Sequence, residues 1–314
     1  MTDEFIPPAP LQTAVLFLVF NRPDTTAQVF EAIRKVKPPR LYVAADGPRP
    51  NREGEAERVA QVRDIATAVD WPCEVKTLFR EENLGCGPAV KKAIDWFFET
   101  ESAGVILEDD TVPTTDFFAF CCELLRKYNN DDRVGMIAGT NHTFYKPDNS
   151  SYVFSRNKAC WGWATWKRAW KNMDFDMTWR NTPQACSVRK NMGYTKVHHK
   201  HWENALRAID ANRVNAWDWH WYFSISAQNQ LTIFPKVNLV SNIGFGDDST
   251  HTKGQPKNEY IKTGIMDFPL VHPKFVCPDY EYDGTFEKIK MGGSNGVRNY
   301  IPQPLKKILR AIFK

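Results

Sequence analysis

The sequence lacks several features that would place the protein in a familiar class. No apolar run approaches the roughly 18 residues needed to cross a bilayer, and the start of the chain has no basic region followed by an apolar one. We therefore expect no membrane span and no secretory signal peptide. The formal net charge is only +4, with scattered basic residues, which gives no indication of nucleic-acid binding. The seven cysteines show no paired CxxC spacing, so we expect reduced thiols in a cytoplasmic protein.

Two nucleotide-binding motifs are also missing. No GxGxxG sequence follows the first apolar segment, which argues against a nicotinamide-dependent enzyme. A Walker A motif is absent as well. His198, His199 and His201 lie close together, but no cysteine or fixed acidic partner completes a zinc-like set. We expect these histidines to be solvated side chains of a helix.

The sequence does contain enough apolar residues for a sizeable core. They make up 42% of the chain, and eleven of them are tryptophans. So many tryptophans fit two interpretations, which are core packing and flat platforms for the apolar face of a sugar ring.

Short apolar segments alternate with amphipathic ones up to about residue 140. This alternation predicts an α/β fold with a mostly parallel central sheet flanked by helices on both faces. The expected strands cover residues 14–20, 41–45, 75–79 and 104–107. The expected helices cover residues 25–36, 52–69, 88–98 and 117–128.

The composition divides the chain into four parts. Residues 1–12 are Pro-rich and predict a loose arm, and residues 13–140 carry the alternating pattern. Residues 141–255 are dense in tryptophan and histidine, and we expect them to pack on the same sheet as a second half of one domain. Residues 256–314 form a C-terminal extension, with loops expected over residues 251–300.

The last segment of that extension is basic and amphipathic. Residues 302–314 (PQPLKKILRAIFK) place four apolar side chains on one helical face and basic ones around it. Such a segment could lie on an anionic membrane surface, or it could be an ordinary helix docked on the domain.

Three polar clusters follow expected strands directly. They are Asn21-Arg22, Asp46-Gly47 and Glu108-Asp109-Asp110. The carboxyl ends of parallel strands meet along one edge of a sheet, so these clusters should converge on one crevice. An arginine there can reach a phosphate, and an aspartate can accept a hydrogen bond from a base or a ribose. Turns also favour Asp and Asn for purely local reasons.

The acidic triplet is the most informative of the three clusters. Adjacent carboxylates repel one another unless a cation or hydrogen-bond donors compensate. Mg²⁺ or Mn²⁺ is a natural compensator, because such ions take one or two carboxylates and leave positions for phosphate oxygens. A solvated acidic turn is the alternative, but the place of the triplet after a buried strand favours the metal–phosphate site.

Asp218 is the candidate general base. It lies in Asn-Ala-Trp-Asp-Trp-His-Trp, over residues 215–221. The flanking Trp217 and Trp219 would partly desolvate the carboxylate and raise its proton affinity, which suits a base working near neutral pH. The alternative is the N-cap of a helix with aromatic neighbours.

Taken in order, these motifs resemble the inverting glycosyltransferases of the GT-A class, and most closely the N-acetylglucosaminyltransferase I type. The resemblance runs from about residue 14 to about residue 251, and the Asn-Leu-Gly element also resembles the family-2 transferases. It rests on Phe20-Asn-Arg-Pro23, Ala45-Asp-Gly47, Asn83-Leu-Gly85, Val105-Ile-Leu-Glu-Asp-Asp110, Trp161-Gly-Trp163, Trp217-Asp-Trp219 and the stretch from Gly244 to His251.

The resemblance implies roles for individual residues. Arg22 would contact the nucleotide diphosphate, Asp46 would bind the base, and Asp110 would be the ligand of Mn²⁺ or Mg²⁺. Glu108 and Asp109 would contact the donor sugar and ribose, and Asp218 would be the catalytic base. The remaining donor contacts implied by the resemblance come from Asn83, Trp163 and a loop that carries Asp247, Asp248 and His251.

The implied activity is metal-dependent transfer of a hexosyl or N-acetylhexosaminyl group with inversion. The donor would be a nucleotide-sugar, expected to be UDP-linked, and the acceptor a glycan or a lipid-linked saccharide. Without an anchor or stem, the sequence looks like a bacterial enzyme of surface polysaccharide or lipopolysaccharide synthesis at the cytoplasmic membrane. Two alternatives remain, a sugar-phosphate nucleotidyltransferase and a non-catalytic glycan-binding protein of the same fold.

Overall fold

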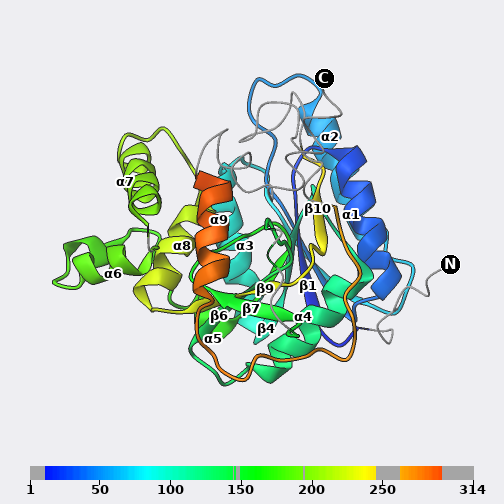
Figure 1. The fold of residues 1–314 in the computed structure, drawn as a ribbon. Coiled ribbons are helices and arrows are strands. Elements are labelled where there is room, and N and C mark those ends of the chain that lie inside the picture. The colour runs from blue at the N-terminus through cyan, green and yellow to red at the C-terminus, as the bar shows by residue number, and fades with distance from the viewer. Residues whose placement is uncertain (1–10, 144, 146–148, 194, 245–261, 292–314) are drawn as a thin grey trace, which may run out of the picture.

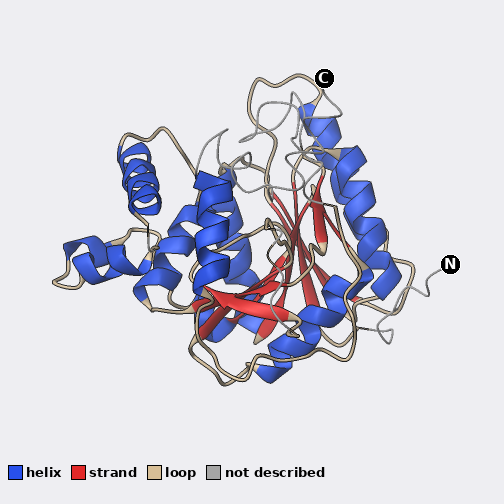
Figure 2. Cartoon of the chain, viewed as in Figure 1, coloured by secondary structure: helices blue, strands red, loops and turns tan. Residues whose placement is uncertain are grey.

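An eight-stranded mixed sheet forms the centre of the molecule (Figures 1 and 2). The structure is a computed structural model that describes residues 11–143, 145, 149–193, 195–244 and 262–291. The strand order is β3-β2-β1-β4-β8-β6-β9-β7. In this order the strands are β3 (Glu74–Phe79), β2 (Arg40–Ala45), β1 (Ala14–Val19), β4 (Ala103–Glu108), β8 (Trp163–Trp166), β6 (Val134–Ala138), β9 (Leu231–Pro235) and β7 (Tyr152–Ser155).

The first four of these strands are parallel, and the rest of the sheet is mixed. β1 pairs in parallel with both β2 and β4, and β2 pairs in parallel with β3. β8 is antiparallel to both of its neighbours, and β6 and β9 are parallel. The order 3-2-1-4 is that of a Rossmann-like sheet, whose ligands bind at the carboxyl ends of the strands.

Helices cover both faces of the sheet (Figure 2). On β1, Val15, Phe17 and Val19 pack against the helices of one face, while Leu16 and Leu18 pack against those of the other. The first face carries α1 (Pro23–Val36), α2 (Glu55–Thr67) and α4 (Thr115–Lys127), and the second carries α3 (Cys86–Thr100), α5 (Lys167–Trp170) and α8 (Trp217–Ala227). A strand covered on both sides must be apolar throughout, which is why all six residues of β1 are buried.

Local signals set the ends of several helices. Pro23 stands at the first position of α1, where its missing N–H costs no hydrogen bond. Lys37 ends that helix in a left-handed conformation and donates its N–H to the carbonyls of Arg34 and Ile33. At the start of α4, the Thr114 hydroxyl accepts a hydrogen bond from the Phe117 N–H.

The second half of the chain adds a helical lobe beside the sheet (Figure 1). It contains a 3₁₀ turn η1 (Thr178–Asn181), α6 (Ala185–Asn191) and α7 (Lys196–Asp210), packed on α8 around a cluster that includes Trp202, Tyr222 and Phe223. His198 on α7 is 0% exposed, and its Nδ1 lies 2.8 Å from Glu287 Oε1. The expectation of solvated histidines is therefore wrong for His198, which joins α7 to helix α9 (Tyr280–Met291).

The sheet and its helices confirm the predicted α/β arrangement, and each element expected before residue 130 is present with slightly different ends. The expectation of loops over residues 251–300 is wrong in part, because α9 (Tyr280–Met291) is a helix. Tyr282 and Phe286 bury it against Phe234. In the described part of the chain, no helix is both long and apolar enough to cross a membrane. The arm of residues 1–12 is described only at its end, and residues 302–314 lie outside the described part.

Candidate functional site

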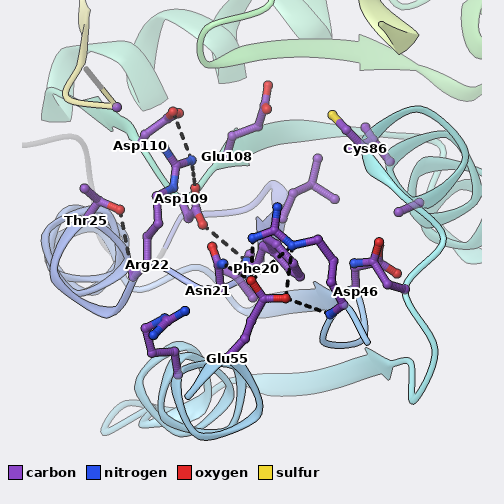
Figure 3. Close-up of a pocket in the computed structure, with 18 of the residues that line it drawn as sticks. Phe20, Asn21, Arg22, Thr25, Asp46, Glu55, Cys86, Glu108, Asp109 and Asp110 are labelled. Carbon is purple, nitrogen blue, oxygen red and sulfur yellow. Dashed lines mark hydrogen bonds and ion pairs between the residues drawn. The ribbon is translucent and has the colours of Figure 1, made fainter. Parts of the chain in front are cut away.

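A pocket of about 920 Å³ opens at the carboxyl ends of β1, β2 and β4 (Figure 3). This volume lies in the range of sites for small molecules and cofactors. The three polar clusters that were predicted to converge do so here, and Asn83 lies with them. The lining includes Arg22, Asp46, Asn83, Glu108, Asp109 and Asp110.

Arg22 ties the first and fourth strands together at the centre of the pocket. Its guanidinium forms an ion pair with Asp109 and lies 3.0 Å from Asp110 Oδ2 (Figure 3). The Phe20 N–H donates to Asp109 Oδ2 at 3.2 Å. Burial alone would lower the pKa of Arg22, but the two carboxylates outweigh it and raise that pKa, so Arg22 stays charged.

The acidic triplet is electrostatically costly, as the sequence suggested. Burial raises the pKa of Asp109 to about 6, although Arg22 acts in the opposite direction. Burial and then repulsion from Asp110, Asp218 and Asp109 raise the pKa of Glu108 well above its usual value. Within the described chain, Arg22 is the cation that contacts the triplet, and it is shared between two of the three acids. The site therefore has a deficit of positive charge.

A short antiparallel ribbon brings a distant segment against Asp110. β5 (Thr111–Pro113) follows the triplet and pairs with β10 (Val240–Asn242). The Ile243 N–H donates to the Asp110 carbonyl at 2.8 Å, and the Asn242 side chain accepts from the Gly244 N–H. A Cβ at Gly244 would lie 2.0 Å from Asp110 Oδ2 and 2.9 Å from Arg22 Nη1. Only a residue without a side chain fits against this ion pair.

Asp46 holds the loop that carries Asn83. Its carboxylate accepts hydrogen bonds from the backbone N–H groups of Leu84 and Gly85, at 3.0 to 3.1 Å. The Asn83 amide donates to the Gly47 carbonyl at 2.8 Å. Asp46 lines the pocket, as predicted, but its carboxylate also has a structural task that the sequence did not reveal.

Glu55 forms a second link beneath the pocket. Its side chain is fully buried and accepts hydrogen bonds from the Asn21 amide at 2.8 Å and from the Arg49 N–H at 2.7 Å (Figure 3). The Arg49 guanidinium pairs with the same carboxylate and holds the pKa of Glu55 down at about 2. The loops after β1 and β2 are thus joined through one carboxylate.

Asp218 is the second residue of α8, whose N-cap is Ala216. It is therefore not the N-cap itself. Asp218 is half-buried and does not line the pocket. Its charge nevertheless acts on Glu108 and Cys86, which do line the pocket. This interaction brings the proposed base to the Glu108 side of the pocket. Burial, with Glu108 and Asp218, raises the pKa of Cys86 to about 12, so that thiol is no nucleophile near neutral pH.

Trp163 is not among the residues that line the pocket. It is 0% exposed on β8, stacks on Trp217 with ring centroids 5.6 Å apart, and belongs to the core. Trp161 lines the pocket instead. The ring of Trp163 is enclosed in this conformation, and the donor contact expected of Trp163 stays a prediction. Asp247, Asp248 and His251 lie outside the described residues.

The sequence reasoning missed three charged residues of the site. Arg80 directly follows β3, is half-buried and lines the pocket. Burial lowers the pKa of Arg80, and the negative charge of Asp46 partly offsets this effect. The strand-end rule that found Arg22 and Asp46 could also have found Arg80. Arg49 lies four residues beyond β2, but nothing in the sequence pairs it with Glu55, because that contact depends on how α2 packs.

The donor set fits a divalent metal held jointly with a phosphorylated ligand. Within the described chain, no group of three or more His, Cys, Asp or Glu side chains is arranged to hold an ion. Mg²⁺ and Mn²⁺ do not need such a group where phosphates complete the coordination. The Asp110 carboxylate lines the pocket with 17% of the side chain exposed. Together with the charge deficit around Glu108, this suits one carboxylate ligand plus phosphate oxygens.

Comparisons with known proteins add no relatives: no model of a protein family matches the chain, and no curated protein matches it significantly. The resemblance drawn from the motifs therefore stays a prediction.

Proposed function

We propose that this protein is a metal-dependent glycosyltransferase of the GT-A class, transferring a sugar from a nucleotide-sugar to a saccharide acceptor. The observation that carries the proposal is the convergence of Arg22, Asp46 and the acidic triplet on one pocket at the strand ends. A pocket with an arginine and a charge-deficient acidic cluster suits a diphosphate with its metal ion. A UDP-linked donor and a glycan or lipid-linked acceptor remain part of this proposal.

Each residue has a defined task in the proposed reaction. Arg22 neutralises the negative charge that develops on the departing nucleoside diphosphate. Asp110 would hold the Mn²⁺ or Mg²⁺ ion, which supplies further positive charge at the same oxygens. Asp46, Asn83 and Arg80 form the wall beyond Arg22, where the nucleoside would lie.

Asp218 would act on the Glu108 side of the pocket. Its carboxylate removes the proton of the acceptor hydroxyl while that oxygen attacks the anomeric carbon. The new glycosidic bond forms as the bond to the diphosphate oxygen breaks, and the nucleoside diphosphate leaves with the electron pair. Attack from the face opposite the leaving group inverts the anomeric carbon.

Two substitutions separate binding from transfer. We expect Asp218→Asn to bind UDP and Mn²⁺ like the unmodified protein but to lose sugar transfer, because the amide cannot accept the proton. We expect Asp110→Ala to lose the Mn²⁺-dependent part of UDP binding. Calorimetry with UDP, with and without Mn²⁺, measures UDP binding in both variants, and an assay of sugar transfer measures the activity of Asp218→Asn. Full transfer by Asp218→Asn, or unchanged UDP affinity in Asp110→Ala, would contradict the assignment.

The donor is identified by a thermal-shift screen of UDP-, GDP- and TDP-sugars with and without Mn²⁺, since a bound ligand stabilises the folded state by mass action. Release of pyrophosphate from a nucleoside triphosphate and a sugar phosphate would favour a nucleotidyltransferase instead. Saccharide binding without any nucleotide binding would favour a glycan-binding protein.

A further inference from the structure

Trp161 is the aromatic residue in the pocket lining on the side towards Asp218. It precedes β8, next to Cys160, whose thiol has its pKa raised by burial and then by Asp218 and Glu108. Trp161 is half-buried, unlike the enclosed Trp163 two residues later. A partly exposed indole on this side of the pocket suits the approach of an acceptor to the proposed base.

Two other side chains hold this indole. The Lys290 ammonium, near the end of α9, lies 5.0 Å from the centroid of the Trp161 ring. His142, from the loop after β6, meets Trp161 edge to face with ring centroids 5.2 Å apart. His142 is 9% exposed, and its Nδ1 has no hydrogen-bond partner among the described residues. Three segments far apart in the sequence thus meet at one aromatic platform.

Apart from its contact with the Trp161 ring, the charge of Lys290 is not used by the described structure. Its side chain is exposed, and no described carboxylate lies within ion-pair distance of its ammonium group. On the same side of the pocket, Glu108 and Asp218 are two carboxylates close enough to affect each other. An acceptor that carried a negative charge would be repelled by these acids unless a cation stood beside it. Lys290 supplies that cation next to the surface on which a sugar ring would stack.

We propose that Trp161 and Lys290 form the acceptor subsite, and that the acceptor is a saccharide carrying an anionic group. The indole packs against the apolar face of a pyranose. The ammonium pairs with a carboxylate or a phosphate on the same or the adjoining sugar. The His142 Nδ1 is an additional polar group at the back of the platform. The proposal rests on the proposed function, because it is the transfer reaction that makes this side of the pocket an acceptor site.

The test measures saccharide binding directly, without sugar transfer. Three probes are used: a neutral disaccharide, the same disaccharide with a uronic acid in place of one hexose, and the same disaccharide bearing a phosphate. The uronate and phosphate arms distinguish the two sources of negative charge. Calorimetry is run on the full chain with UDP and Mn²⁺ and again without them, so failure of nucleotide binding is recorded separately from failure of the acceptor subsite.

We expect at least one anionic probe to bind about fivefold more tightly than the neutral one, a margin set by a single partly exposed ion pair. Lys290→Gln should remove this preference, so that the three probes bind with similar affinities, whereas Trp161→Ala should weaken all three probes. Lys288→Gln is the matched control, because it removes the same charge from the same helix; it should keep the preference.

The proposal is overturned if the unmodified protein binds no probe or shows no anionic preference. It is also overturned if the preference survives in Lys290→Gln or falls equally in Lys288→Gln. Urea denaturation serves as the folding control for Trp161→Ala, and Trp161→Phe, which keeps a flat ring, should recover part of the binding.

Discussion

Replacing Gly244 by alanine should damage the site without removing any charged group. The added Cβ would lie 2.0 Å from Asp110 Oδ2, whereas real Cβ atoms do not approach other atoms closer than 3.0 Å. The carboxylate must therefore move by at least about 1 Å, away from a position 3.0 Å from Arg22. The Ile243 N–H bond to the Asp110 carbonyl holds the two backbones together, so the side chain must yield.

The consequences for stability and for binding differ in size. A carboxylate at the end of a side chain can rotate aside, so we expect the free energy of unfolding to fall by about 1 kcal/mol, at the low end of the range for overpacking. Metal–ligand distances, however, tolerate deviations of only about 0.2 Å. Loss of one charge-assisted contact costs about 1.5–3 kcal/mol, which corresponds to roughly 10- to 100-fold weaker binding of UDP with Mn²⁺.

Calorimetry measures the binding, and urea denaturation measures the stability. Gly284→Ala on α9 is the matched control, because a Cβ there meets nothing within 4 Å. That variant should bind UDP normally and be slightly more stable, as expected for alanine in place of a helical glycine. If Gly244→Ala binds UDP with Mn²⁺ as tightly as the unmodified protein, Asp110 does not act from the position described, and the reasoning fails.

Three other outcomes are expected. Trp163→Ala should lower the free energy of unfolding by about 3–5 kcal/mol in urea, because it empties a core position, while the folded fraction still binds UDP; selective loss of UDP binding would restore Trp163 as a ligand contact. Glu55→Gln should lower the free energy of unfolding by about 1–3 kcal/mol in the same assay and weaken UDP binding, because the loops of Asn21 and Arg49 would no longer share one carboxylate. Unchanged stability and UDP binding would refute that link. Burial raises the pKa of Asp283 from 3.8 to about 6, so its contribution to stability is complete below pH 3.8 and is lost as the pH rises through 6. Asp283→Asn should remove that part of the pH dependence, which amounts to about 3 kcal/mol at most in the free energy of unfolding between pH 4 and pH 7. An unchanged pH profile would show that Asp283 does not titrate in this range.

The first half of the fold could be predicted because each element there carries its own signal. Strands buried on both faces are continuous apolar runs, and the helices between them keep one apolar stripe. The end of α1 is an example, since Val36 closes its apolar pattern at the residue where the helix ends. Such signals are local, so they can be recognised without knowledge of the tertiary structure.

The second half of the fold depends on long-range contacts that cannot be predicted from local sequence patterns. Residues 280–291 are polar in composition, and α9 gains its burial from Tyr282 and Phe286 against Phe234, a strand residue almost fifty positions earlier. β8 has only four residues, and its antiparallel place between β4 and β6 follows from pairing alone.

The site shows the same division. Arg22, Asp46 and the triplet were identified because the strand-end rule needs only the order of elements. The choice between Trp161 and Trp163 needed the strand register: Trp163 is the first residue of β8 and pairs with Ile106, which turns its ring into the core. All four residues of β8 are buried because helices cover both faces of the sheet, so the difference between the two tryptophans depends on where the strand begins, and the motif alone does not contain that information.

The position of β8 also has a consequence for how the chain can be divided. β6 belongs by sequence to the first half, yet it pairs only with β8 and β9, which come later. A fragment ending at residue 140 would leave β4 with an unpaired edge along Val105 and Ile106, both fully buried in the intact protein. Exposed apolar edge strands recruit other chains, so such a fragment should aggregate instead of folding. During synthesis the same edge stays open until β8 has been made, and the sheet reaches its final order only after β9, which comes later in the chain, has entered between β6 and β7.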